Sequence, residues 1–266
     1  MPTVTVQDAL IHYDRTGGGP RPPLLLVHGT GSAGAPLTWG QAAPALARDR
    51  AVITPDLSGA DRTRDAGGPL TVEGLAAQVA AVAEDAAGAA AGPVDLLGFS
   101  MGAPVAAATA ALRPDLVRRL VLVAGWAHTD SDEYMRNLFA LWQRLGHSDA
   151  EAFGRSVTMT GFSRAFLNSI GSAEVERLIP NMPPTTGTMR HVDLDTRVDI
   201  RALLPRVRAR TLVLGATRDA TVPVENSRAL HAAIEGSSYA ELDAGHVAFF
   251  ERPAEFADLV DAFLTD

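Results

Sequence analysis

One pentapeptide constrains the fold of this chain more than any other feature. Residues 98–102 read Gly98-Phe99-Ser100-Met101-Gly102, between a strand-like stretch at 93–97 and an alanine-rich, helix-like stretch at 103–112. So sharp a reversal from strand to helix forces the central serine into a strained conformation, and the glycines leave room for the neighbouring chain. The serine oxygen is then exposed above a helix N-terminus, whose free N–H groups favour developing negative charge. The segment therefore predicts an activated nucleophile, Ser100.

Strand-like and helix-like segments alternate along most of the 266 residues. Mostly apolar runs, typical of strands covered on both faces, occupy residues 23–27, 51–54, 120–123 and 211–214, and a further strand is expected at 94–97. A hairpin at 3–13 precedes them, helices are expected at 39–46, 72–87, 224–234 and 253–264, and a strand at 238–242. This alternation predicts an α/β fold with a mainly parallel sheet and right-handed crossovers.

Residues 126–205 break the alternation, because they contain amphipathic helix-like segments but no clear buried strand. We expect them to form a helical cap inserted into a core domain made of residues 1–125 and 206–266. Apolar walls are usual for small-molecule sites, and most of the cap's apolar side chains should simply pack it onto the sheet. The side chains expected to contact a substrate are Trp126, Leu138, Trp142, Phe162 and Val247.

Composition excludes several classes of function. The absence of cysteine rules out disulfides and thiolate catalysis, and the absence of lysine rules out Schiff-base chemistry. A net charge of −8 without any basic run argues against nucleic acid as a partner. The N-terminus shows no secretion signal, and no apolar stretch reaches the roughly 18 residues of a membrane span. A cytoplasmic protein that does not bind membranes is expected.

A serine hydroxyl needs a base within hydrogen-bond reach, and the base needs a third group that fixes its tautomer. His246 follows the strand-like residues 238–242, which places it at the sheet edge where α/β folds bind ligands. It is the predicted base, against the alternative of a surface loop histidine. His28 also follows a strand, and we expect it to shape the following turn. The other histidines lack this context: His12, His128, His147, His191 and His231.

Asp219 is the predicted acid, because it comes after the strand-like residues 211–214 and can reach His246 from the same edge. The alternative is a turn or capping aspartate before the next helix. Other aspartates are less well placed: Asp193, Asp195 and Asp199 lie near the end of the insertion, and Asp130 would have to reach back.

An oxyanion hole needs two backbone N–H donors. Met101, next to the nucleophile, should supply one and Thr30, in the glycine-rich turn after residues 23–27, the other. The glycines at 17–19 lack the Gly-Lys-Ser/Thr ending of a phosphate loop, and no His-Glu-x-x-His or similar ligand cluster occurs. No metal and no organic cofactor are therefore predicted.

These segments together resemble the α/β-hydrolase fold superfamily over nearly the whole chain. Five elements stand in that family's order: His28-Gly29-Thr30-Gly31, Pro55-Asp56-Leu57-Ser58-Gly59, the pentapeptide around Ser100, Asp219 and Gly245-His246. The resemblance implies an eight-stranded, mostly parallel sheet with a helical cap. It also implies a triad of Ser100, His246 and Asp219 with an oxyanion hole at Thr30 and Met101. Ala60 and Ala103 replace glycines that many relatives carry, both small-for-small changes.

The predicted function is that of a serine hydrolase cleaving an ester, lactone or thioester of a small apolar molecule through an acyl-enzyme on Ser100. The chain is expected to act as a monomer or homodimer. A carbon–carbon bond hydrolase, an acyl-eliminating tailoring enzyme of a biosynthetic pathway, and a non-enzymatic small-molecule receptor remain alternatives, since fold and triad do not choose among them. Epoxide hydrolase and dehalogenase activities are disfavoured, because they need a carboxylate nucleophile.

Overall fold

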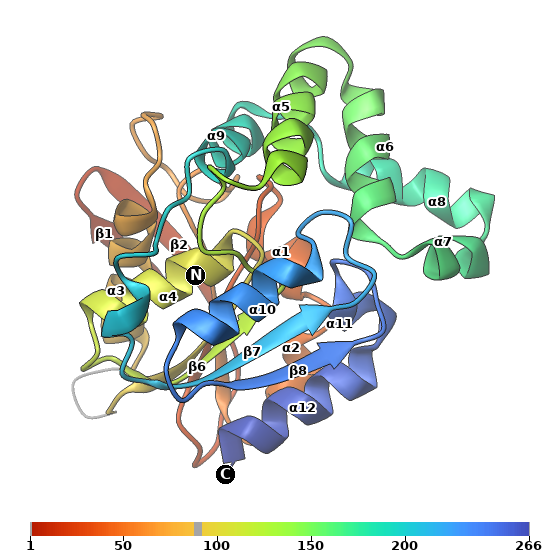
Figure 1. Ribbon diagram of the computed structural model, residues 1–266. Coiled ribbons are helices and arrows are strands. Elements are labelled where there is room, and N and C mark those ends of the chain that lie inside the picture. Colours follow the sequence, from red (N-terminus) through yellow and green to blue (C-terminus); the bar gives the residue numbers. More distant parts are fainter. Residues whose placement is uncertain (1, 88–91, 266) are drawn as a thin grey trace.

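The computed structural model describes residues 2–87 and 92–265 of the chain (Figure 1). Within them an eight-stranded sheet has the order β1-β2-β4-β3-β5-β6-β7-β8. Pairs β1/β2 and β2/β4 are antiparallel and the others parallel, so the predicted mostly parallel sheet is confirmed. The strands are β1 (Thr3–Val6), β2 (Ala9–Gly17), β3 (Leu24–Val27), β4 (Ala51–Asp56), β5 (Val94–Phe99), β6 (Val117–Val123), β7 (Arg210–Ala216) and β8 (Ser238–Leu242).

Helices cover both faces of the sheet. Because side chains alternate along a strand, Leu25 and Val27 of β3 belong to one buried cluster, and Leu24 and Leu26 to the other. The first cluster includes residues of α3 (Val72–Ala87), α4 (Gly102–Leu112) and α10 (Val224–Ala233). The second includes residues of α1 (Gly34–Trp39), α2 (Ala43–Leu46), α11 (Ala248–Glu251) and α12 (Pro253–Thr265). The central strands β3, β4 and β5 are therefore buried along their whole length, as predicted.

The expectation of one helix over residues 39–46 is wrong. The structure has two short helices there, α1 ending at Trp39 and α2 beginning at Ala43. Pro44 lies in the first turn of α2. A proline has no N–H to donate and is accommodated only at the start of a helix, so α1 cannot continue through it.

The segment between β6 and β7 is helical and gathers outside the sheet (Figure 1). Residues 133–195, called the cap segment below, contain α5 (Glu133–Ser148), α6 (Ala150–Gly161), α7 (Arg164–Ile170), α8 (Ser172–Leu178), the 3-10 turn η1 (Ile179–Asn181) and α9 (Thr186–Asp195). A second such turn, η2 (Leu204–Arg206), precedes β7. The division into domains at 125/126 and 205/206 stays a prediction.

Polar residues define where the cap helices begin. A side-chain oxygen accepts a backbone N–H of the first turn at α5, α6, α7 and α9, from Asp132, Asp149, Ser163 and Thr185 respectively. Such N-terminal acceptors satisfy donors that the helix itself leaves free. On α5 the buried positions 135, 138, 139 and 142 form one face, as the amphipathic pattern predicts.

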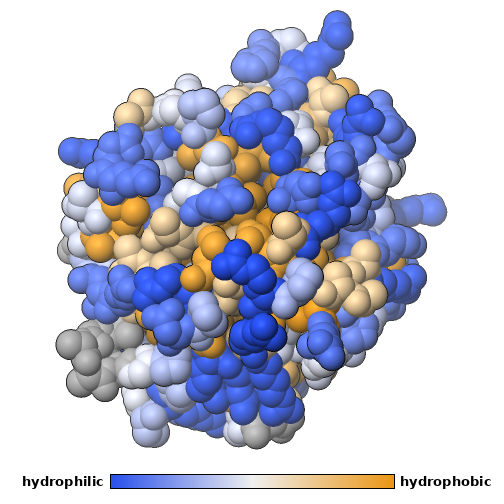
Figure 2. Space-filling model, turned by 60° about the vertical axis from the view of Figure 1, so that its left-hand side comes forward, coloured by the Kyte–Doolittle hydropathy of each residue, from blue (hydrophilic) through white to orange (hydrophobic). Residues whose placement is uncertain are grey.

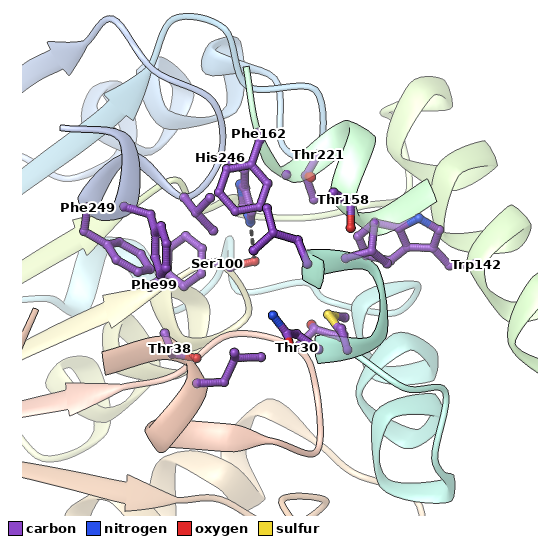
Figure 3. A pocket seen from close by; sticks show the side chains of 18 residues that line it. Thr30, Thr38, Phe99, Ser100, Trp142, Thr158, Phe162, Thr221, His246 and Phe249 are labelled. Atoms are coloured by element: carbon purple, nitrogen blue, oxygen red, sulfur yellow. Dashed lines mark hydrogen bonds between the residues drawn. The ribbon is translucent and has the colours of Figure 1, made fainter. Parts of the chain in front are cut away.

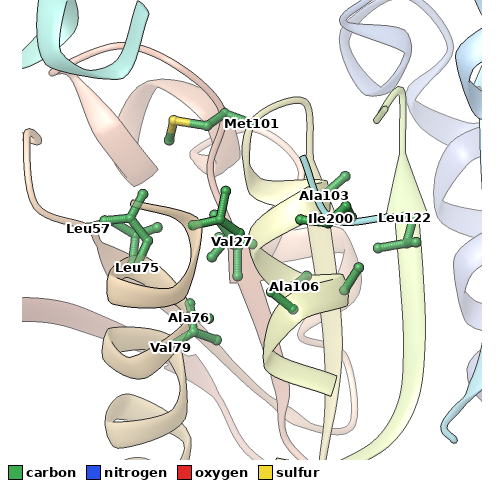
Figure 4. Close-up of a cluster of buried hydrophobic side chains, with 14 of the residues drawn as sticks. Val27, Leu57, Leu75, Ala76, Val79, Met101, Ala103, Ala106, Leu122 and Ile200 are labelled. Carbon is green, nitrogen blue, oxygen red and sulfur yellow. The ribbon is translucent and has the colours of Figure 1, made fainter. Parts of the chain in front are cut away.

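The helix after Ser100 is anchored in the core. Met101, Ala103 and Ala106 belong to the same fully buried cluster as Val27 and Leu122 of the sheet (Figure 4). On the face seen in Figure 2, hydrophilic side chains surround scattered apolar surface. Among the helices in the described ranges, none is both long and apolar enough to cross a bilayer.

Candidate active site

Ser100 lies on a sharp turn between β5 and α4, with a φ of +54°. A side chain on Gly98 would meet the carbonyl of Gly102, and one on Gly102 would meet the carbonyls of Val27 and His28. Both glycines are thus required by close backbone approach. The strained serine between them is the conformation that the pentapeptide predicts.

The structure brings the three predicted polar side chains into one hydrogen-bonded chain. The distance from Ser100 Oγ to His246 Nε2 is 2.8 Å, and from His246 Nδ1 to Asp219 Oδ2 it is 2.7 Å. The carboxylate partner assigns the ring proton to Nδ1, so Nε2 is left to accept the serine proton. All three side chains are buried, with that of Asp219 only 1% exposed.

Parallel topology explains why residues so far apart in sequence meet. Ser100 follows β5, Asp219 follows β7 and His246 follows β8, all at the carboxyl edge of the sheet. The backbone N–H groups of Thr221 and Val222 donate to Asp219 Oδ1, each at 2.8 Å. These bonds fix the carboxylate, so that its other oxygen is directed at His246.

The turn after β3 lies against the nucleophile. A side chain on Gly29 would come 2.9 Å from Ser100 Cβ, so only glycine lets this turn approach so closely. The His28 Nδ1–H donates to the carbonyl of Gly29 at 2.7 Å, and Nε2 accepts the Leu57 N–H at 3.0 Å. Burial lowers the pKa of His28, which matches these two bonds of a neutral ring. His28 therefore shapes the turn, as the sequence predicts.

The two predicted oxyanion donors are both backbone groups beside Ser100. Across residues 2–87 and 92–265, neither the Thr30 N–H nor the Met101 N–H donates a hydrogen bond within the protein. Buried or half-buried N–H groups normally find a partner, so two free donors next to a nucleophile suit a developing oxyanion.

A cavity of about 160 Å³ opens above Ser100 (Figure 3). Its walls are mostly apolar, and among them are Phe99, Trp142, Val157, Phe162, Val247 and Phe249. The lining thus includes three of the five predicted substrate contacts: Trp142 and Phe162 from the cap segment and Val247 beside His246. The polar residues of the lining are Thr30, Thr38, Ser100, Thr158, Asn181, Thr221 and His246.

Trp126 and Leu138 are not among the lining residues, so this part of the prediction is wrong. The Trp126 indole N–H donates to Thr129 Oγ at 2.9 Å, and its ring packs beside Phe139 in the core. Leu138 precedes Trp142 by one helical turn on α5, a displacement of about 6 Å along the axis. It packs into the buried cluster instead of the cavity.

Sequence reasoning missed part of the wall. Phe99 belongs to the pentapeptide, and Phe249 and Phe250 follow His246 directly, so proximity to a motif was the available signal. Leu37 and Thr38 come from α1, after the glycine-rich turn, where no such signal exists.

Two buried polar side chains of α9 also lie beside the site. Asp195, 1% exposed, accepts a hydrogen bond of 2.6 Å from Thr30 Oγ, and burial raises the pKa of its carboxyl to about 7. His191, fully buried, lies with its ring centre 5.9 Å from that of His28. Neither follows a strand, so the strand-end criterion passed over both. The described residues contain no group of three or more side chains suited to hold a metal ion.

Comparisons with known proteins agree with this fold. The sequence model described as alpha/beta hydrolase fold matches residues 22–253. A pyrrolizixenacetamide deacetylase from Xenorhabdus hominickii is 39% identical over 99% of this chain and 98% of its own length. A putative carbamate hydrolase from Azorhizobium caulinodans is 31% identical over 94% and 92%. The crystal structure of an enol-lactonase from Burkholderia xenovorans, 22% identical, covers both chains completely with a TM-score of 0.85.

The chain therefore belongs to the α/β-hydrolase fold family, and the predicted fold class and resemblance are confirmed. Several relatives are named as hydrolases, among them the deacetylase, the carbamate hydrolase and a 2-hydroxy-6-oxo-2,4-heptadienoate hydrolase from Pseudomonas putida, and the protein is an enzyme of this fold family.

Proposed function

We propose that this enzyme is a serine hydrolase that removes a short acyl group from a small, largely apolar molecule through an acyl-enzyme on Ser100. The observation that carries the proposal is the chain from Asp219 through His246 to Ser100, which ends in an apolar cavity. The cavity's 160 Å³ lies below the roughly 300–1,000 Å³ of drug-sized sites, which favours a short acyl group.

Each residue has a defined role in this reaction. Ser100 Oγ attacks the carbonyl carbon while His246 Nε2 takes its proton, and Asp219 stabilises the resulting imidazolium. The N–H groups of Thr30 and Met101 hold the tetrahedral oxyanion. His246 then gives its proton to the departing alcohol, thiol or amine as the carbon–heteroatom bond breaks. A water molecule, deprotonated by His246, attacks the acyl-enzyme and releases a carboxylic acid and free Ser100.

The name of one relative and one side chain beside the site bear on the scissile bond. The 39% identical relative is named as a deacetylase of an acetamide, so an amide joins the ester, lactone and thioester as a substrate class. Thr221 is one of the residues that line the cavity, and its hydroxyl is buried without a hydrogen-bond partner in the described part of the chain. The Thr221 backbone N–H and the His246 ring both bind Asp219, so this residue lies beside the base that would protonate the leaving group. We assign it to a polar atom of the substrate there.

Intact-mass spectrometry after incubation with a fluorophosphonate tests the nucleophile. A single adduct is expected on the wild type and none on Ser100→Ala. Hydrolysis rates are then compared between p-nitrophenyl acetate and longer acyl esters, and between an ester and an amide of the same acetyl group. A folded wild type that forms no adduct, or a Ser100→Ala variant with near-normal turnover, contradicts the proposal and favours the receptor alternative.

A further inference from the structure

Three side chains of α9 contact three consecutive residues of the turn that carries the Thr30 N–H. Thr188 Oγ accepts the Ser32 N–H at 3.0 Å, and His191 Nδ1 accepts the Gly31 N–H at 3.1 Å. Asp195 completes the series by accepting the 2.6 Å hydrogen bond from Thr30 Oγ. The spacing 188, 191, 195 puts all three on one helical face. The turn runs antiparallel to α9 along that face, from Thr30 opposite Asp195 to Ser32 opposite Thr188.

These contacts lie in the interior of the protein. Thr188 and His191 are 0% exposed and Asp195 is 1% exposed. A side chain on Gly187 would meet the backbone of Gly59, so the start of α9 lies directly on the Ser58-Gly59 turn. A helix packed so closely gives its side chains fixed positions from which to hold the turn.

His191 bridges two segments of the core domain. Its Nε2–H donates to the carbonyl of Ser58 at 2.8 Å, which leaves Nδ1 as the acceptor for the Gly31 N–H. The bond from the Gly31 N–H requires the neutral ring, because a protonated Nδ1 cannot accept, and burial lowers the pKa of His191 to about 3. The bridge is therefore intact throughout the neutral pH range.

The turn depends on α9 for the partners of its N–H groups, whereas its carbonyls are held by other segments: the Gly31 carbonyl accepts the Gly34 N–H at 3.2 Å and the Ser32 carbonyl accepts the Asp61 N–H at 2.7 Å. Gly31 has a φ of +129°, a region that favours glycine, and glycine has the largest conformational freedom of any residue. His28 holds the turn from the sheet side through Gly29, and nothing on that side binds the Gly31 or Ser32 N–H groups within residues 2–87 and 92–265.

We propose that Thr188, His191 and Asp195 are positioning residues for the oxyanion hole: α9 holds the turn 30–32 so that the Thr30 N–H stays directed at the oxyanion formed on Ser100. The inference rests on the proposed function. The cap segment thus contributes to the chemical step itself, in addition to the wall of the cavity. His191 is the central residue, because its two nitrogens join the oxyanion turn to the core.

Two substitutions of His191 separate positioning from packing. In His191→Gln the amide nitrogen replaces Nε2, which keeps the donor to Ser58 and removes the acceptor for Gly31. In His191→Asn the amide oxygen replaces Nδ1, which keeps the acceptor for Gly31 and removes the donor to Ser58. Both variants insert a neutral amide at the same buried site and lose one hydrogen bond, so they are matched in structural cost.

The full chain is assayed for kcat and KM with p-nitrophenyl acetate, together with its rate of inactivation by a fluorophosphonate. His191→Gln should lower kcat and the inactivation rate about 10–100-fold and leave KM within about 3-fold, since a displaced oxyanion donor weakens only transition-state binding. His191→Asn, which keeps the acceptor for the Gly31 N–H, should have a kcat within about 5-fold of the wild-type value. His231 lies on α10, far along the chain from the turn; His231→Gln removes its hydrogen bond to Ser237 and should leave kcat unchanged.

Equal kcat losses in the two His191 variants, or an unchanged kcat in a folded His191→Gln, overturn the inference. Should His191→Gln fail to fold, Thr188→Val replaces it, because valine keeps the volume and removes only the hydroxyl. An unchanged kcat in a folded Thr188→Val variant would also overturn the inference. A wild type that does not react with the fluorophosphonate contradicts the proposed function instead, whereas a reactive wild type with insensitive variants contradicts the positioning role alone.

Discussion

Asp195 gives the protein a pH-dependent stability that one substitution should remove. Its carboxyl is buried with one oxygen bonded to Thr30 Oγ, while Oδ1 has no partner among the described residues. Burial raises its pKa from 3.8 to about 7, and the Thr30 hydrogen bond offsets this only in part. The folded protein therefore holds a proton that the unfolded chain releases between these two pH values.

The sign follows from this difference in bound protons. Where the folded state binds more protons than the unfolded state, the free energy of unfolding falls as pH rises. The free-energy cost of ionising the buried Asp195 carboxyl is small below pH 4. This cost grows as pH rises to 7 and is nearly constant above that. The shift from 3.8 to about 7 corresponds to about 4 kcal/mol, of which about 3 kcal/mol appears between pH 4.5 and 8.5.

Asp195→Asn keeps an acceptor for Thr30 but cannot ionise, so it should lack this penalty. Relative to wild type, the variant should gain about 3 kcal/mol between pH 4.5 and pH 8.5, or about 6–12 °C in melting temperature. Urea unfolding followed by tryptophan fluorescence at the two pH values measures this gain. Because every other titrating group is common to both proteins, the difference isolates Asp195.

Asp193→Asn, half exposed on the same helix, is the matched control for an amide on α9. A stability difference between Asp195→Asn and wild type that stays constant from pH 4.5 to 8.5 refutes the reasoning. It would mean that water or a rearrangement reaches the carboxylate and that its burial carries no electrostatic cost.

Three further outcomes are expected at the site. Asp219→Asn should lower kcat about 10⁴-fold with little change in KM, since the ring would adopt the wrong tautomer, and steady-state kinetics at pH 7 measures this. Thr221→Val should lower kcat/KM about 10-fold or more for an acetamide but leave a simple aryl acetate within about 3-fold, with Thr221→Ser as the restoring control. Phe162→Ala, which removes a ring from the cavity wall, should shift the preference among p-nitrophenyl esters toward longer acyl chains; an unchanged profile would place the acyl group elsewhere.

The positions of Ser100, Asp219 and His246 could be predicted because each follows a strand-like stretch of the sequence. Parallel strands end at one edge of a sheet, so residues that follow different strands meet there without any knowledge of the loops. The pentapeptide added a local constraint, since its two glycines are needed by backbone contacts that exist only in a strand-to-helix turn. Local pattern and topology together were sufficient for these three residues.

Trp126 and Leu138 show where such reasoning ends. The periodicity of α5 gives the buried face of the helix, and Leu138 and Trp142 share that face. It gives no information on which turn of the helix reaches the cavity, because that depends on how the cap segment docks. Apolar character alone could not distinguish the core from the cavity wall, since both are built from the same side chains.

His191 and Asp195 mark a different limit. Their spacing with Thr188 predicts a common polar face on α9, and in the structure this polar face is a buried one. A buried polar face must find partners, so the pattern demanded a hydrogen-bonding surface opposite it. Only the tertiary structure shows that this surface is formed by residues 30–32, through the Thr30 hydroxyl and the Gly31 and Ser32 N–H groups. The pattern of side chains along the sequence does not indicate which backbone groups pack against α9. Backbone donors carry the oxyanion chemistry here, and the side chains that hold them are the part of the site that sequence reasoning could not find.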